Sequence, residues 1–82
     1  MKHVEFIPQN VCSRKITFDI TDDNKISNLS FTGGCNGNLK AISKLLEGFP
    51  ADKAIEILQG NTCGMRNTSC ADQLTKAIKE NI

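Results

Sequence analysis

The stretch KITFDITDDNKISNLSFTGG, residues 15–34, decides the fold class of this 82-residue chain. Apolar and polar residues alternate over residues 16–20, which is the period of a strand with one buried face. The polar cluster at residues 22–25 has the composition of a tight turn, and Leu29 and Phe31 follow it with the spacing of a second strand. The stretch therefore predicts an antiparallel hairpin that ends at two glycines.

Outside this hairpin, alternating apolar residues at Val4 and Phe6 predict a preceding strand. One residue breaks the alternation, because Ile26 is out of phase with Leu29 by one position. A bulge in the strand and a place for Ile26 inside the turn both explain this shift, and the sequence leaves the two open.

After the glycine pair the apolar spacing becomes helical and predicts three helices. The first begins near Asn36 or Asn38 and ends at Gly48, and the second follows Pro50 and ends at Gly60. The residues expected to face the core are Leu39, Ile42, Leu45, Leu46 and Phe49 in the first helix, Ala54, Ile55 and Leu58 in the second, and Leu74, Ala77 and Ile78 in the third.

The third helix carries a start signal in its sequence. Ser69 can cap the helix, and Asp72 stands three residues later, as in a capping box with Asp in place of Glu. Strands followed by helices predict one α+β domain over residues 1–82, a three-stranded antiparallel meander with three helices packed on one face.

Composition excludes several classes of function. A net charge of +1 and an aromatic content of 5% offer little to neutralise phosphates or stack on bases, so direct binding of nucleic acid is not expected. No apolar run approaches the roughly 20 residues that span a bilayer, and the first residues lack the apolar stretch of a signal peptide. We expect a cytoplasmic protein without a membrane segment, in which cysteines are thiols or ligands rather than static disulfides.

The chemistry is expected at four cysteines, Cys12, Cys35, Cys63 and Cys70. Cys35 and Cys70 each stand where a helix is predicted to begin, and the partial positive charge of a helix N-terminus favours the thiolate. Cys12 precedes a strand and Cys63 lies in the loop before Cys70, so packing the helices over one end of the sheet brings these positions together. Thiolates suit zinc or an iron-sulfur cluster, and the four cysteines are therefore the predicted metal ligands.

The segment Thr68–Leu74 (TSCADQL) resembles the motif that names the TSCPD domain family, with Ala71 where that motif has proline. Residues 31–39 (FTGGCNGNL), 46–48 (LEG) and 58–64 (LQGNTCG) are also similar to the stand-alone form of this domain. The domain also occurs at or near the C-terminus of some ribonucleotide reductases. The resemblance implies a link to deoxyribonucleotide synthesis, with ribonucleotide reductase or another redox protein as partner, and it is the sole basis for expecting a nucleotide to bind. It supplies no mechanism, and 82 residues are too few for a reductase on their own.

A more distant likeness is to iron-sulfur scaffold proteins of the NifU N-terminal type. Cys12, Cys35 and Cys70 are similar in position to the three cysteine ligands of that family, which implies a scaffold-like fold. Where the scaffold has a histidine before its last cysteine, this chain has Ser69, and Cys63 can replace the lost ligand. Four cysteinates describe a more closed site than a scaffold needs for releasing its cluster.

Three hypotheses for the function of the four cysteines follow. The favoured hypothesis is a zinc or iron-sulfur accessory module. The alternatives are a thiol-disulfide relay through Cys63 and Cys70, and an iron-sulfur assembly scaffold. A homodimer is a further expectation, because three ligands in one chain leave a coordination position that a second copy can fill.

Overall fold

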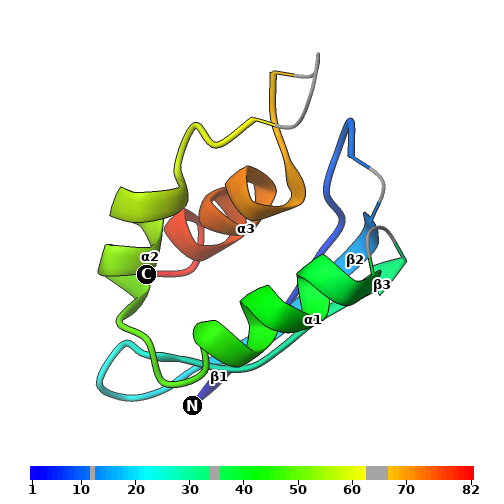
Figure 1. The fold of residues 1–82 in the computed structure, drawn as a ribbon. Coiled ribbons are helices and arrows are strands. Elements are labelled where there is room, and N and C mark those ends of the chain that lie inside the picture. Colours follow the sequence, from blue (N-terminus) through cyan, green and yellow to red (C-terminus); the bar gives the residue numbers. More distant parts are fainter. Residues whose placement is uncertain (12, 34–35, 63–66) are drawn as a thin grey trace.

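The computed structural model describes residues 1–11, 13–33, 36–62 and 67–82, and within them it confirms the α+β class (Figure 1). The strands form one antiparallel sheet in the order β1-β2-β3, and the helices follow on one side of it. The bounds are β1 Lys2–Phe6, β2 Ser13–Ile20, β3 Ile26–Gly33, α1 Asn36–Leu45, α2 Ala51–Leu58 and α3 Cys70–Lys79.

A bulge between β2 and β3 accounts for the irregular apolar spacing in the hairpin. The two strands pair Ile20 with Ile26, and their register shifts between Thr17 and Asp19. Opposite this shift Asn28 adopts a φ of 55°, in the left-handed region that asparagine tolerates better than most residues. Ile26 is fully buried and begins β3, so the bulge is the correct one of the two explanations.

The core lies between the sheet and the helices. It combines the alternate residues of the strands with the apolar side of α3 and a few positions of α1 and α2, as the predicted periods require. Its buried members are Val4, Ile16, Phe18, Ile20, Ile26, Leu29, Leu46, Ala51, Ala54, Leu74, Ala77 and Ile78.

One predicted core position is wrong. Leu45 is 77% exposed, whereas Leu39 and Leu46 on the same segment are buried. At 100° per residue, Leu45 lies about 120° around the helix from Leu39, while Leu46 falls almost directly below it. Helix α1 therefore buries the stripe that contains Leu39 and Leu46 and leaves Leu45 outside it.

Backbone hydrogen bonds fasten the connection between α1 and α2 to the start of β3. The N–H of Gly48 donates to the carbonyl of Ile26 at 2.7 Å, and the N–H of Ile26 donates to the carbonyl of Phe49 at 2.9 Å. The N–H of Ala51 donates to the carbonyl of Asn24 at 2.8 Å. Gly48 has a φ of +76°, which ends α1 and turns the chain back toward the sheet. These bonds fix the relative positions of α1 and α2.

None of the helices within the described ranges has the length and apolar content needed to cross a lipid bilayer.

Candidate functional site around Cys70

Helix α3 begins at Cys70 because Ser69 caps it. Ser69 has extended backbone angles, and its hydroxyl accepts a hydrogen bond from the N–H of Asp72 at 3.1 Å. The predicted cap is confirmed, and Cys70 occupies the first position of the helix. Its sulfur therefore sits at the N-terminal end of α3.

The carboxylate of Asp72 does not complete the capping box. It turns instead to the preceding segment, where it accepts hydrogen bonds from the N–H of Gly60 at 2.7 Å and from the hydroxyl of Thr68 at 2.6 Å. These two donors, Thr68 first, hold the pKa of the Asp72 carboxyl below its ordinary value. A buried, ionised carboxylate thus ties the end of α2 to the start of α3.

Gln73 makes a second buried link, toward the N-terminal part of the chain. Its side-chain carbonyl accepts from the N–H of Gln9 at 3.1 Å, and its amide donates to the hydroxyl of Thr68 at 3.0 Å. The residue is 3% exposed. Because Thr68 also donates to Asp72, one run of hydrogen bonds joins the segment after β1 with the segment after α2.

The sulfur of Cys70 faces the first residue of β2. The hydroxyl of Ser13 lies 3.1 Å from the sulfur, within hydrogen-bond distance, and Ser13 is 4% exposed. Ser13 is also the register partner of Gly33, the last residue of β3. The ends of two strands therefore meet the start of α3.

The segment after α2 reaches the same place through Asn61. The hydroxyl of Ser69 donates to the carbonyl of Asn61, and the side-chain amide of Asn61 lies 3.4 Å from that hydroxyl. Ser69 thus caps α3 and is also hydrogen-bonded to Asn61, which precedes the loop between α2 and α3.

Of the four predicted ligands, the structure places Cys70. Cys12, Cys35 and Cys63 lie outside the described residues. Within the described ranges no three histidine, cysteine, aspartate or glutamate side chains form a group suited to a metal ion. The four-cysteine metal site stays a prediction.

Sequence reasoning missed two residues at this site. Nothing in the sequence indicates a role at the site for Ser13 except its position next to Cys12, and Gln73 looks like an ordinary helix residue. Their partners are 57 and 64 residues away in the sequence, so no local pattern reports them.

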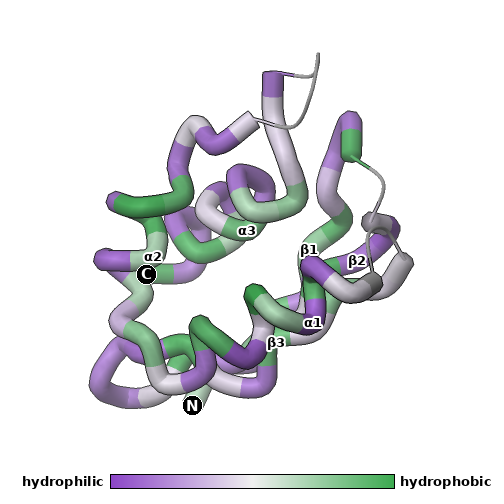
Figure 2. The backbone as a smooth tube through the Cα atoms, in the orientation of Figure 1, coloured by the Kyte–Doolittle hydropathy of each residue, from purple (hydrophilic) through white to green (hydrophobic). Residues whose placement is uncertain are grey.

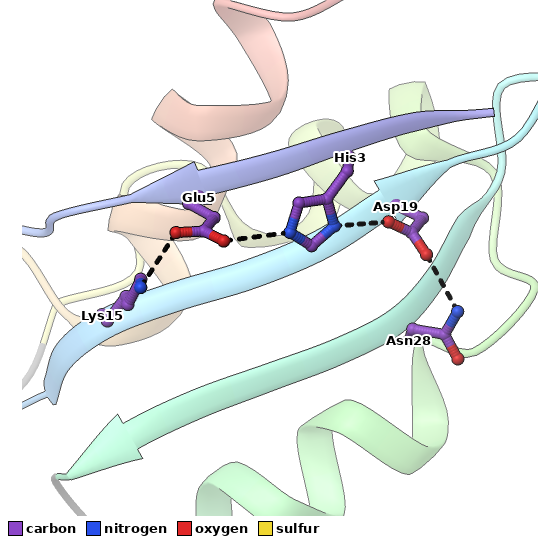
Figure 3. Close-up of polar contacts among 5 residues, drawn as sticks. All are labelled: His3, Glu5, Lys15, Asp19 and Asn28. Carbon is purple, nitrogen blue, oxygen red and sulfur yellow. Dashed lines mark hydrogen bonds and ion pairs between the residues drawn. The ribbon is translucent and has the colours of Figure 1, made fainter.

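A separate polar cluster lies on the face of the sheet away from the core (Figure 3). His3 stands between two carboxylates, with Asp19 at 2.7 Å from one ring nitrogen and Glu5 at 3.2 Å from the other. Lys15 pairs with Glu5 at 2.9 Å, and the amide of Asn28 donates to Asp19 at 2.9 Å. Hydrogen bonding to Asp19, and then to Glu5, raises the pKa of His3 above its ordinary value. The cluster joins all three strands.

The model of the TSCPD domain family matches residues 1–82, the whole chain. No curated protein and no solved structure matches.

Proposed function

The chain belongs to the TSCPD domain family, and from this membership and the contacts around Cys70 we propose that it is a small metal-binding accessory module. In this proposal Cys12, Cys35, Cys63 and Cys70 hold a zinc ion or an iron-sulfur cluster. Ribonucleotide reductase, or another redox protein, is the proposed partner. The link to deoxyribonucleotide synthesis comes from the resemblance to the family alone.

One observation carries the proposal: described residues close in sequence to the other three cysteines gather at the start of α3. Ser13 adjoins Cys12 and contacts the Cys70 sulfur. Gly33 stands two residues before Cys35 and pairs with Ser13. Asn61 stands two residues before Cys63 and is bonded to Ser69, the neighbour of Cys70.

These contacts support a shared metal site because consecutive Cα atoms are only about 3.8 Å apart. Cys12, Cys35 and Cys63 each stand one or two positions along the chain from one of the contacts, which is close enough to reach such a site. The sulfur of Cys70 suits such a centre, because it lies at a helix N-terminus with a hydroxyl donor at hydrogen-bond distance. A thiolate there accepts the hydrogen bond of Ser13, which orients the sulfur and stabilises its charge.

The donor set decides what a bound group supplies. Four thiolates suit tetrahedral zinc or an iron-sulfur cluster, and such a group would add a cross-link between sheet and helices or a one-electron carrier. A chain of this length has a small core, and a structural metal is a common supplement at this size.

Elemental analysis with free-thiol counting tests the proposal. Protein purified without chelator is expected to contain close to one zinc, or the iron of one cluster, and to lose it on Cys→Ser substitution at each of the four positions. Ser43→Ala, in α1, serves as the control and keeps the metal. Less than about a tenth of an equivalent of zinc or iron in the wild-type protein contradicts the proposal.

A thiol-disulfide relay is the second candidate. The contact between Asn61 and Ser69 supports it, since these residues stand two before Cys63 and one before Cys70. In the relay the two thiols pass two electrons and two protons to a partner disulfide, which becomes two thiols as Cys63 and Cys70 join. A glutathione titration of the Cys12→Ser, Cys35→Ser double variant tests this, because a relay keeps its reversible disulfide whereas a four-cysteine metal site loses its metal.

A further inference from the structure

Strand β3 is an edge strand, because the strand order of the sheet is β1-β2-β3. On the side away from β2, the backbone N–H and C=O groups of an edge strand can pair with another extended chain. In Figure 1 helix α1 runs back along β3, and α1 packs against this strand. A chain that pairs with β3 therefore comes to lie beside α1.

The first part of this edge is already paired within the chain. Residues 24–26 form an antiparallel bridge with residues 48–51, in the connection between α1 and α2. Glu47 covers the next positions, since its carboxylate accepts from the N–H of Asn28 at 2.9 Å and from the hydroxyl of Ser27 at 2.8 Å. A segment and a carboxylate of the chain itself thus dock at the start of β3.

The last part of the edge is open. Among the described residues, no backbone hydrogen bond from outside the sheet reaches residues 29–32. A hollow of about 330 Å³ lies beside them, between β3 and α1. Ser30 is exposed and lines this hollow, so the open edge and the hollow adjoin each other.

Both apolar and basic side chains line the hollow between β3 and α1. Leu29, Phe31 and Leu39 give it an apolar floor, since the two leucines are buried and Phe31 is half-buried. Lys40 and Lys44, about one turn apart on α1, give it a basic rim. Figure 2 shows hydrophilic and hydrophobic residues in turn along this helix. The hollow therefore suits a group with an apolar stem and a negative charge at its end.

The two lysines of the rim are not neutralised within the chain. No ion pair among the described residues uses Lys40 or Lys44, although all nine acidic residues of the sequence lie in the described part. Glu47, the acidic residue nearest to them in the sequence, is bonded to β3. Like charges four residues apart on a helix repel each other, so carboxylates from another molecule stabilise this pair.

A second copy of the chain does not suit this edge. Antiparallel pairing of two β3 edges about a two-fold axis places both α1 helices on the same face of the joined sheet. Lys40 and Lys44 of one copy then face the same lysines of the other, and the repulsion among four ammonium groups opposes association. The charge of the hollow indicates an acidic partner instead.

We propose that the open part of the β3 edge binds an extended segment of another protein with glutamates at alternate positions. The segment adds a fourth strand beside β3 through backbone hydrogen bonds. Alternate side chains of a strand lie on one face about 7 Å apart, and residues four apart on a helix rise about 6 Å. Glutamates at every second position thus match Lys40 and Lys44. Their methylene groups cover the apolar floor of the hollow.

A blocked peptide of alternating threonine and glutamate, TETETET, is the probe, and NMR of the isotope-labelled protein follows its binding. Binding is expected to shift the amide signals of residues 29–32 and 40–44 and to slow hydrogen exchange within residues 29–32. An absence of binding at peptide concentrations on the order of 1 mM overturns the proposal.

Two control peptides separate strand addition from simple attraction of charge. TTEEETT has the same composition without the alternation, and a TETETET peptide with every backbone amide methylated cannot donate hydrogen bonds to β3. Both are expected to bind at least about tenfold more weakly than TETETET. Equal binding of the methylated peptide would mean an anion site without strand pairing, and it overturns the proposal.

Charge reversal tests the role of the two lysines. The double variant Lys40→Glu, Lys44→Glu is expected to bind TETETET at least about tenfold more weakly. Lys53→Glu, Lys79→Glu is the matched control, because it makes the same change of net charge at exposed helix positions outside the hollow, and its binding changes by less than about twofold. Thermal unfolding curves check that both variants fold.

Two further outcomes count against the proposal. Equal weakening in the two double variants would mean that only the overall charge of the protein matters. Shifts of the amides of residues 29–32 that depend on protein concentration, without peptide, would mean that a second copy occupies the edge.

Discussion

The hydroxyl of Ser13 lies 3.1 Å from the sulfur of Cys70 and joins the start of β2 to the start of α3. Both residues are the first of their elements, so this single contact fixes where the end of the sheet meets the last helix. A substitution at Ser13 therefore acts on the junction between the sheet and α3.

Replacing Ser13 by alanine removes the hydroxyl that lies within hydrogen-bond distance of the Cys70 sulfur. If the cysteines hold a metal, we expect its affinity to fall by about 10-fold to 100-fold, the usual effect of losing a hydrogen bond to a ligand. The free energy of unfolding of the metal-free protein falls by only about 1 kcal/mol. Competition with a chromophoric chelator measures the affinity, and Ser30→Ala in β3 is the control. Equal affinities in the two variants contradict the prediction.

Replacing Asp72 by asparagine weakens the link between α2 and α3. The amide has one acceptor oxygen where the carboxylate has two, so the N–H of Gly60 or the hydroxyl of Thr68 loses its partner. We expect the free energy of unfolding to fall by about 1–3 kcal/mol, measured by urea denaturation. Asp52→Asn makes the same chemical change at an exposed position of α2 and is expected to cost far less.

Replacing Gln73 by leucine breaks the link to Gln9. We expect the amide proton of Gln9 to exchange faster with solvent, because it loses its buried acceptor. The amide proton of Gly60, which is bonded to Asp72, keeps its protection and is the internal reference. Hydrogen exchange followed by NMR distinguishes the two, and a uniform increase at both amides would mean general destabilisation instead.

The cluster around His3 predicts a pH dependence of stability with two limits. The pKa of His3 is raised, so its contribution is complete below the ordinary value of 6.5 and is lost as the pH rises through the raised folded value. The pKa of Asp19 is lowered by Asn28 and then His3, so its contribution is complete above 3.8 and is lost as the pH falls through the lowered folded value.

His3→Gln checks the alkaline limit. The variant is expected to lose less stability than the wild type between slightly acidic and slightly alkaline pH, measured by urea denaturation at each pH. An NMR titration of the wild type places the imidazole midpoint above 6.5. A midpoint at or below that value contradicts the prediction.

Local patterns in the sequence predict the parts of the fold that depend on local chemistry. The alternation over β2 and the cap at Ser69 gave the correct strand and the correct helix start, because both depend on residues a few positions apart. Leu45 was predicted wrongly, because it lies about 120° around α1 from the buried Leu39, and its apolar side chain alone does not indicate which side of the helix packs on the core. The bulge at Asn28 was one of two open explanations, and cross-strand register decides between them.

The candidate site likewise has features that local sequence predicts and features that depend on tertiary packing. The place of Cys70 at a helix start followed from its neighbours, whereas its contact with Ser13 and the bridge made by Gln73 depend on tertiary packing. Ligation by Cys12, Cys35 and Cys63, the nature of the metal and the resemblance to an assembly scaffold stay predictions.

The hydrogen bonds at the start of α3 also constrain the order of events during synthesis. Ser13 and Cys70 are 57 residues apart, and Gln9 and Gln73 are 64 apart, so neither contact can form until α3 has left the ribosome. Contacts of such long sequence separation require a large loop to close, which slows folding. If the proposed metal is held in part by Cys70, its complete site can assemble only after α3 has been synthesised.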